Sequence, residues 1–427
     1  MPSTIQFISG AAKVAQVQTI TITPTGAYDA TTNYKATIGN VTYSVINAGS
    51  TNATATALAA ALTASNHPYF SYLTFTSLAG VITVTTKSDY HGAPFTLTVS
   101  VVTGGGTIAT AVTVAATGPN HFDNTANWSG GVVPVTGDKV ILADTSQPIL
   151  WNIDQNAITL AEFHIYQTYT GKIGLNRGAI TQSSNGGFAS SDAPEYRTDI
   201  YMKISSTKTF LGENYSPTKA NGSGRILIDF GSVTTQSIEV FNTAAQASET
   251  GKPAFRFKVN NSNAVLIVRS SPGGVGIAMD LAGETSSIGT ISMLDDSNAS
   301  KMYVGLGTTI GTSFTQYGGN NIVQAAATIP LINMYGGILE TDGDFTITAC
   351  NVTGGTFNCN NFKTGGNFIT TLNVFGGTTD FSGTSRARTC AAANLYKNAT
   401  LKYDPNFTTI TALNYTSTQG PLQISVK

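Results

Sequence analysis

The side chains of this sequence that could cleave a bond are a few scattered carboxylates. Hydrolysis of a glycosidic bond uses two carboxyl groups about 5 to 10 Å apart, one as acid and one as base or nucleophile. The candidates are Asp342 and Asp344 in the segment ETDGDF, and Glu195 and Glu213 upstream. Aspartates flanking a glycine more often hydrogen-bond their own backbone in a turn. The sequence therefore leaves open whether the protein is an enzyme, with a polysaccharide hydrolase or lyase as the enzymatic alternative.

No local motif indicates a metal or a cofactor. Cys350, Cys359 and Cys390 lie late in the chain, without a CxxC pair or a neighbouring histidine. Structural zinc sites need four such ligands, usually in closely spaced pairs. The motifs GxSxG, HExxH and GxxxxGK[ST] are also missing. We predict no metal, no cofactor and three buried free thiols.

A tyrosine-containing segment supplies the candidate binding side chains. Tyr196, Tyr201 and Tyr215 lie within residues 182–219, which read as a long loop excursion. An exposed tyrosine can bind a sugar face or a protein surface, and such loops often carry specific contacts. A place in the core or at a strand edge is the alternative for these rings.

A repeated asparagine marks the C-terminal part of the chain. It lies between apolar or small residues at Asn333, Asn351, Asn373, Asn394 and Asn414, with spacings of 18, 22, 21 and 20 residues. Three of the five are followed at the same offset by a glycine pair, which suits a corner that needs positive φ. This period predicts the coils of a right-handed parallel β-helix. The asparagines either form an internal amide ladder or adopt the left-handed conformation at a turn.

The elements that must position these residues are strands. Only 11% of the 427 residues are charged and 44 are glycine, a composition that excludes a mostly helical protein. Period-two alternation predicts six strands within the first 117 residues, at 14–23, 34–47, 69–77, 81–87, 95–102 and 107–116. Leu58, Ala61, Leu62 and Ser65 share one face of a predicted helix over 51–66.

The predicted fold is mainly β and has two parts. Residues 1–117 form a small β-rich docking domain with one helix, and the turn-forming segment 118–121 is a linker. Residues 122–427 form the parallel β-helix, with the loop excursion near 182–219. Stacked coils bury a continuous core that no single coil can bury alone.

Three segments carry a family resemblance. AAKVAQVQTITIT, the helical TALAAALTAS and the stretch GPNHFDNTANWSGGVVPVTGDKVIL together resemble a module of tailed-bacteriophage virion structural proteins, of the capsid decoration, head fibre or tail spike type. The resemblance covers about the first 145 residues and carries over no functional residue. It implies a non-enzymatic homotrimer that docks on capsid or tail proteins of the same virion and contacts a host surface glycan.

The net charge and the N-terminal sequence further limit the expected partners and location. The net charge is −1 without a basic cluster, so we expect no nucleic-acid partner. No apolar run is long enough for membrane insertion. The start MPSTIQFISG lacks the order of a secretion signal, so we expect synthesis in the host cytoplasm, release by lysis and a place on the virion surface. A bacterial surface adhesin is the remaining alternative, and it would need an export route.

Overall fold

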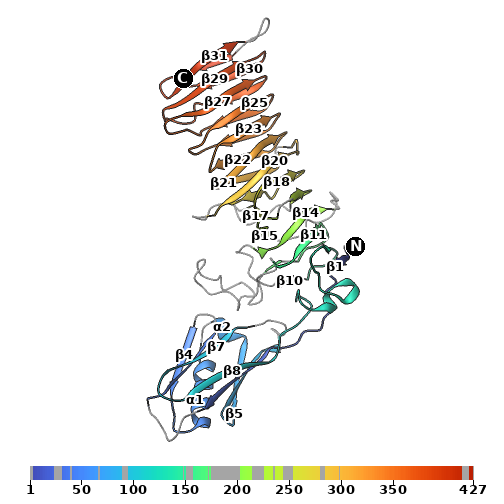
Figure 1. The fold of residues 1–427 in the computed structure, drawn as a ribbon, viewed down its shortest axis with the longest axis vertical. Helices are drawn as coiled ribbons and strands as arrows, with labels where there is room; N and C mark the ends of the chain where they lie inside the picture. The colour runs from blue at the N-terminus through green and yellow to red at the C-terminus, as the bar shows by residue number, and fades with distance from the viewer. Residues whose placement is uncertain are drawn as a thin grey trace.

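The structure is a computed structural model. It describes residues 3–23, 31–38, 41–65, 68–88, 95–147, 149–150, 157–171, 173–174, 202–213, 226–233, 236–243, 253–278, 284–297, 299–415 and 423–426. Figure 1 shows a small β-rich domain at one end and a long stack of parallel strands that carries the C-terminal part of the chain at the other.

The N-terminal domain consists of two antiparallel sheets and a helix. One sheet has the order β5-β6-β2-β8 and the other β4-β3-β7. Their strands are β2 (Val17–Thr23), β3 (Asn33–Ile38), β4 (Val41–Ile46), β5 (Leu73–Leu78), β6 (Val81–Thr86), β7 (Leu97–Thr103) and β8 (Thr107–Val114). Alternate residues of β2, β3 and β6 are buried, as period-two sequences require when one sheet face meets a core.

The predicted strand over 34–47 is two strands. β3 and β4 pair as an antiparallel hairpin in which Thr37 lies opposite Thr42. The intervening sequence is Gly39-Asn40, a dipeptide typical of two-residue hairpin turns. The hairpin signal was present in the sequence, but the continuous alternation on both sides concealed it.

The predicted helix is present as α1 (Thr51–Thr63), and a short helix α2 (Pro68–Ser71) follows. Ser50 caps the N-terminus of α1 by accepting a hydrogen bond from the backbone N–H of Ala53 at 3.1 Å. The buried face consists of Thr54, Ala55, Leu58, Ala59 and Leu62. The buried face is therefore rotated from the predicted one, with Thr54, Ala55 and Ala59 in place of Ala61 and Ser65.

The stack contains two rows of parallel strands, here called row A and row B. Row A consists of β1 (Thr4–Gln6), β9 (Lys139–Leu142), β11 (Thr159–Tyr166), β14 (Ser205–Glu213), β16 (Ser237–Val240), β18 (Asn260–Val268), β20 (Ser286–Met293), the second half of β21 (Lys301–Gln316), β23 (Ile329–Met334), β25 (Ile347–Val352), β27 (Asn367–Val374), β29 (Arg388–Leu395) and β31 (Thr408–Tyr415). This row of strands extends along most of the height of the stack (Figure 1).

Row B completes the stack. It consists of β13 (Met202–Lys203), β15 (Ile226–Asp229), β17 (Phe255–Lys258), β19 (Val275–Ile277), the first half of β21, β22 (Asn320–Ala325), β24 (Ile338–Thr341), β26 (Thr356–Cys359), β28 (Gly377–Asp380), β30 (Ala399–Tyr403) and β32 (Gln423–Val426). β10 (Ile149–Leu150) and β12 (Ile173–Gly174) pair with each other, and 3-10 turns cover Thr125–Asn127 and Ser129–Gly131. One hydrophobic cluster runs through the stack from Ile5 to Leu401.

The first strand of the chain belongs to the stack and not to the N-terminal domain. Ile5 lies opposite Val140 in the parallel pairing of β1 with β9, and Ile5 is part of the core of the stack. The core of the N-terminal domain extends only from Ile20 to Leu97. The predicted domain of residues 1–117 therefore needs a correction at its N-terminal end. β1 belongs to the stack, and the domain is inserted between β1 and β9.

Three contacts hold the junction of the domain and the stack. Val14 and Thr117 form an antiparallel bridge, so the chain enters and leaves the domain at neighbouring points. Asn127 is fully buried and accepts a hydrogen bond from the backbone N–H of Ala11 at 2.9 Å. Trp128 packs edge-on against Phe7, with ring centroids 5.3 Å apart, and covers the first coil of the core.

Candidate functional site

The predicted carboxylates do not form one site in the described part of the chain. Glu195, Tyr196, Tyr201 and Tyr215 lie outside the described residues. Glu213 ends β14, whereas Asp342 and Asp344 are exposed beyond β24, several strands further along the stack. No pairing of Glu213 with either aspartate is possible in this arrangement.

Asp344 ties one coil to the next. Its carboxylate accepts hydrogen bonds from the backbone N–H of Thr364 at 3.3 Å and from the Thr364 hydroxyl at 2.8 Å. Lys363 Nζ lies 3.2 Å from the same carboxylate. The Thr364 hydroxyl and then the cation lower the pKa of Asp344. A general acid needs a raised pKa, so this carboxylate is set up for turn structure rather than proton donation.

Glu213 belongs to a different cluster, on the outer side of row A. His164 is nearly fully buried; its Nδ1 contacts Glu213, and its Nε2 lies 2.9 Å from Glu162. The imidazole stacks on Phe210 with ring centroids 4.5 Å apart, and Lys139 Nζ lies 3.3 Å from Glu162. The hydrogen bond from His164 is the largest cause of the lowered pKa of Glu162. The imidazole occupies the space between the two carboxylates, so the cluster joins β9, β11 and β14.

The repeated asparagines form a ladder across row A. They lie opposite one another in the strand pairings of β23, β25, β27, β29 and β31. Each amide donates to the side-chain oxygen of the preceding asparagine, at 2.9 Å from Asn351 to Asn333, 2.9 Å from Asn373 to Asn351, 2.8 Å from Asn394 to Asn373 and 2.9 Å from Asn414 to Asn394. None of the five has positive φ, which excludes the turn alternative. The ladder lies on the half-buried outer side of the row, not inside the core.

Replacing Asn373 with alanine tests what the ladder contributes. The change removes two side-chain hydrogen bonds, to Asn351 and from Asn394, and each is worth about 1 kcal/mol net. We expect the free energy of unfolding, measured by urea denaturation, to fall by about 1–2 kcal/mol. The control is Asn358→Ala, because Asn358 is also half-buried and makes no side-chain hydrogen bond to the described residues. Equal losses in both variants would show that the ladder adds no stability.

A column of side chains that contains four aromatic rings, here called the aromatic column, borders the ladder. It occupies the position directly after each row A strand from β20 to β29, namely Leu294, Tyr317, Tyr335, Thr353, Phe375 and Tyr396. The same position after β18 holds Arg269. The rings of Tyr317 and Tyr335 stack with centroids 4.7 Å apart, and those of Phe375 and Tyr396 with centroids 4.4 Å apart. Stacked rings cover each other's faces and present their edges, so the column suits a protein surface better than a sugar face.

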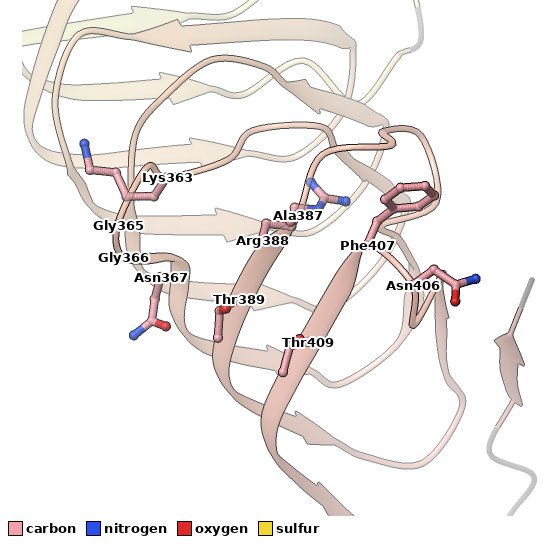
Figure 2. Close-up of a pocket in the computed structure, with 10 residues that line it drawn as sticks. All are labelled: Lys363, Gly365, Gly366, Asn367, Ala387, Arg388, Thr389, Asn406, Phe407 and Thr409. Atoms are coloured by element: carbon pink, nitrogen blue, oxygen red, sulfur yellow. The ribbon is translucent and has the colours of Figure 1, made fainter.

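A cavity of about 430 Å³ opens near the last coils. It is lined by Lys363, Gly365, Gly366, Asn367, Ala387, Arg388, Thr389, Asn406, Phe407 and Thr409. Figure 2 shows that these side chains do not converge, and that Lys363 and Asn406 extend away from each other. A specific ligand site needs polar groups aimed at one point, so this cavity lacks the main feature of such a site.

The buried cation of this cavity is used by the fold itself. Arg388 is 4% exposed, and its Nη1 donates to the carbonyls of Cys359 at 2.6 Å and Asn361 at 2.8 Å. Its Nη2 donates to the carbonyl of Phe381, and its guanidinium lies 4.6 Å from the ring centroid of Phe368. Burial lowers the pKa of Arg388. The side chain therefore joins neighbouring coils instead of facing a ligand.

The three cysteines are buried and unpaired. Burial raises the pKa of Cys359 and of Cys390 to about 12, and that of Cys350 well above its ordinary value. The thiolate is the reactive form, so we expect iodoacetamide at pH 8 to modify all three thiols in urea and none in the native protein. The same pKa shifts remove stability as the pH rises above about 9, because the unfolded chain then releases protons that the folded chain retains. Mass spectrometry of the alkylated protein provides the measurement, and rapid native labelling would contradict the burial.

No family model, curated protein or solved structure matches this chain. Across the described residues, no group of three or more histidine, cysteine, aspartate or glutamate side chains is arranged to hold a metal ion. None of the helices in that part of the chain is long and apolar enough to span a membrane.

Proposed function

We propose that this protein is a non-enzymatic structural component of a phage virion. In this proposal the stack is a right-handed parallel β-helix with coils of about 20 residues, and it projects as a capsid decoration, fibre or short spike. The N-terminal domain docks on capsid or tail proteins, and the chains associate with one another, in the expected form as a homotrimer. The projecting part faces the host surface and its glycans.

The observation that carries the proposal is the use of chemically versatile side chains as links between coils. Asp344 bonds to Thr364, Glu213 to His164, Arg388 to carbonyls of neighbouring coils, and the asparagines to one another. Such links, added to a core shared by all coils, favour a durable rod. The inserted N-terminal domain has its own core and so supplies a separate unit for attachment.

The junction geometry allows the two roles to be separated cleanly. Because Val14 and Thr117 are neighbours, residues 15–116 can be replaced by a short Gly-Ser linker without disturbing β1. We expect a 13–118 fragment to bind virions that lack this protein, and the linker variant not to bind. Co-sedimentation with purified particles provides the measurement. Binding by the linker variant alone would reverse the roles, and binding by neither would remove the docking proposal.

The enzymatic alternative is tested on the intact chain. Release of oligosaccharides from capsule or lipopolysaccharide, abolished by Glu195→Ala, Glu213→Ala, Asp342→Ala or Asp344→Ala, would replace the structural proposal with a glycosidase or lyase. Thr364→Ala is a suitable control, because it removes the bond to Asp344 and leaves every carboxylate in place.

A further inference from the structure

One outer face of the stack is free of charge over many coils. In the described row A strands from β18 to β31, the only side chain that is charged at neutral pH is Arg388, which is buried. Their outward side chains are mainly alanine, threonine, serine and asparagine. We call the outer side of row A from β18 to β31, together with the aromatic column beside it, the uncharged face.

The other row carries charges on the same coils. Lys301, Glu340, Asp380 and Lys402 lie in row B strands, and none of them is buried. The lack of charge is therefore a property of one face and does not follow from the composition of the chain alone. Water-exposed surfaces usually carry mixed charges, and protein interfaces lack charge at their centres and are enriched in tyrosine and phenylalanine.

The aromatic column adds the apolar part of such a surface. Tyr317, Tyr335 and Phe375 are 45%, 47% and 43% exposed. Tyr317 and Tyr335 lie in adjacent coils along one edge of the uncharged face, and Thr353 occupies this position in the coil between Tyr335 and Phe375. Large apolar side chains scattered singly need no explanation, but two stacked pairs of rings along one edge indicate an interaction site.

The size of the face suits a stable contact. Eight strands about 4.8 Å apart and about six residues long cover roughly 35 Å by 20 Å, or about 700 Å². One partner of a standard protein interface contributes about 800 Å². The face is thus large enough for a specific protein contact.

We propose that the uncharged face is the surface through which copies of this chain associate laterally. A surface without charge offers no ion pair to a charged partner, whereas a second copy repeats the same coil spacing and can match it coil by coil. The proposal rests on one part of the proposed function, namely that copies of this chain associate with one another. It goes beyond that function by naming the side of the stack that each chain presents to its neighbour.

Two matched substitutions test this surface. Thr371 lies on β27 in row A, and Thr378 lies on the next strand, β28, in row B. Both side chains are half-buried and point outward. Light scattering after size exclusion should give the parent a mass two or three times 44.4 kDa. Thr371→Glu should reduce the mass to that of one chain, and Thr378→Glu should leave it unchanged. Tyr335→Ser, at an exposed ring, should also give single chains and supplies a second test if Thr371→Glu does not fold.

Three outcomes would overturn the inference. They are a parent that is monomeric at every concentration, a Thr371→Glu variant that folds and keeps its multiple mass, and a Thr378→Glu variant that dissociates equally. Failure of the virion-binding experiment would contradict the docking role without changing these masses. The two proposals therefore fail separately.

Discussion

Replacing Arg388 with methionine is expected to lower the free energy of unfolding by about 3–5 kcal/mol, because each buried acceptor left without a donor costs about 1–3 kcal/mol. The guanidinium donates to the carbonyls of Cys359 and Asn361 through one nitrogen and to that of Phe381 through another. Methionine fills much of the volume but donates nothing, so three buried carbonyls lose a hydrogen bond. Urea denaturation followed by circular dichroism measures the change.

Arg386 provides the matched control. It is an exposed arginine two residues earlier, and its guanidinium lies 4.3 Å from the ring centroid of Phe362. An exposed contact of this type is worth about 0.5–1 kcal/mol, so Arg386→Met should have a much smaller effect. Arg388→Lys should also be strongly destabilising. The planar guanidinium donates to carbonyls in different directions, and a single ammonium group cannot reach all of them. Similar stability of the two methionine variants would contradict the structural role of Arg388.

The row A strands of the C-terminal coils could be predicted from the sequence, for a physical reason. Coils of nearly constant length place Asn333, Asn351 and Asn373 at equivalent positions, so spacing alone fixes which residues lie side by side. Most strands and the helix of the N-terminal domain could also be predicted, since alternation and helical spacing reflect burial on one face. How the strands divide into two sheets could not. The outward orientation of the ladder also follows from the sequence, because apolar or small residues flank each Asn and successive side chains of a strand point to opposite faces.

The links between distant coils could not be predicted. His164 contacts Glu213 across 49 residues, and Ile5 pairs with Val140 across the inserted domain. Such pairs depend on the register of strands whose repeat is irregular, and no local pattern marks them. The role of Arg388 could not be predicted for the same reason, because its partners lie on three separate segments, at Cys359 and Asn361, at Phe381 and at Thr408. The uncharged face becomes visible only when strands are sorted into rows.

Replacing Gly355 with alanine is expected to lower the free energy of unfolding by about 2–4 kcal/mol, from left-handed strain together with a steric clash. Gly355 has φ of 78°, and an added Cβ would lie 2.5 Å from the carbonyl oxygen of Gly337. The corner repeats along the stack at Gly319, Gly337, Gly355, Gly377 and Asn398, with φ of 83°, 74°, 78°, 74° and 67°. Each corner thus packs its backbone directly on the preceding one.

Gly365 separates the two causes of this loss. Its φ is 72°, but an added Cβ would meet nothing within 4 Å. Gly365→Ala should therefore cost only the left-handed strain of about 1–2 kcal/mol, and the additional loss in Gly355→Ala measures the close approach of consecutive coils. Thermal and urea unfolding of both variants provide the comparison. Equal losses would mean that the corners shift apart at little cost, and that the glycine column is needed for its φ angles alone.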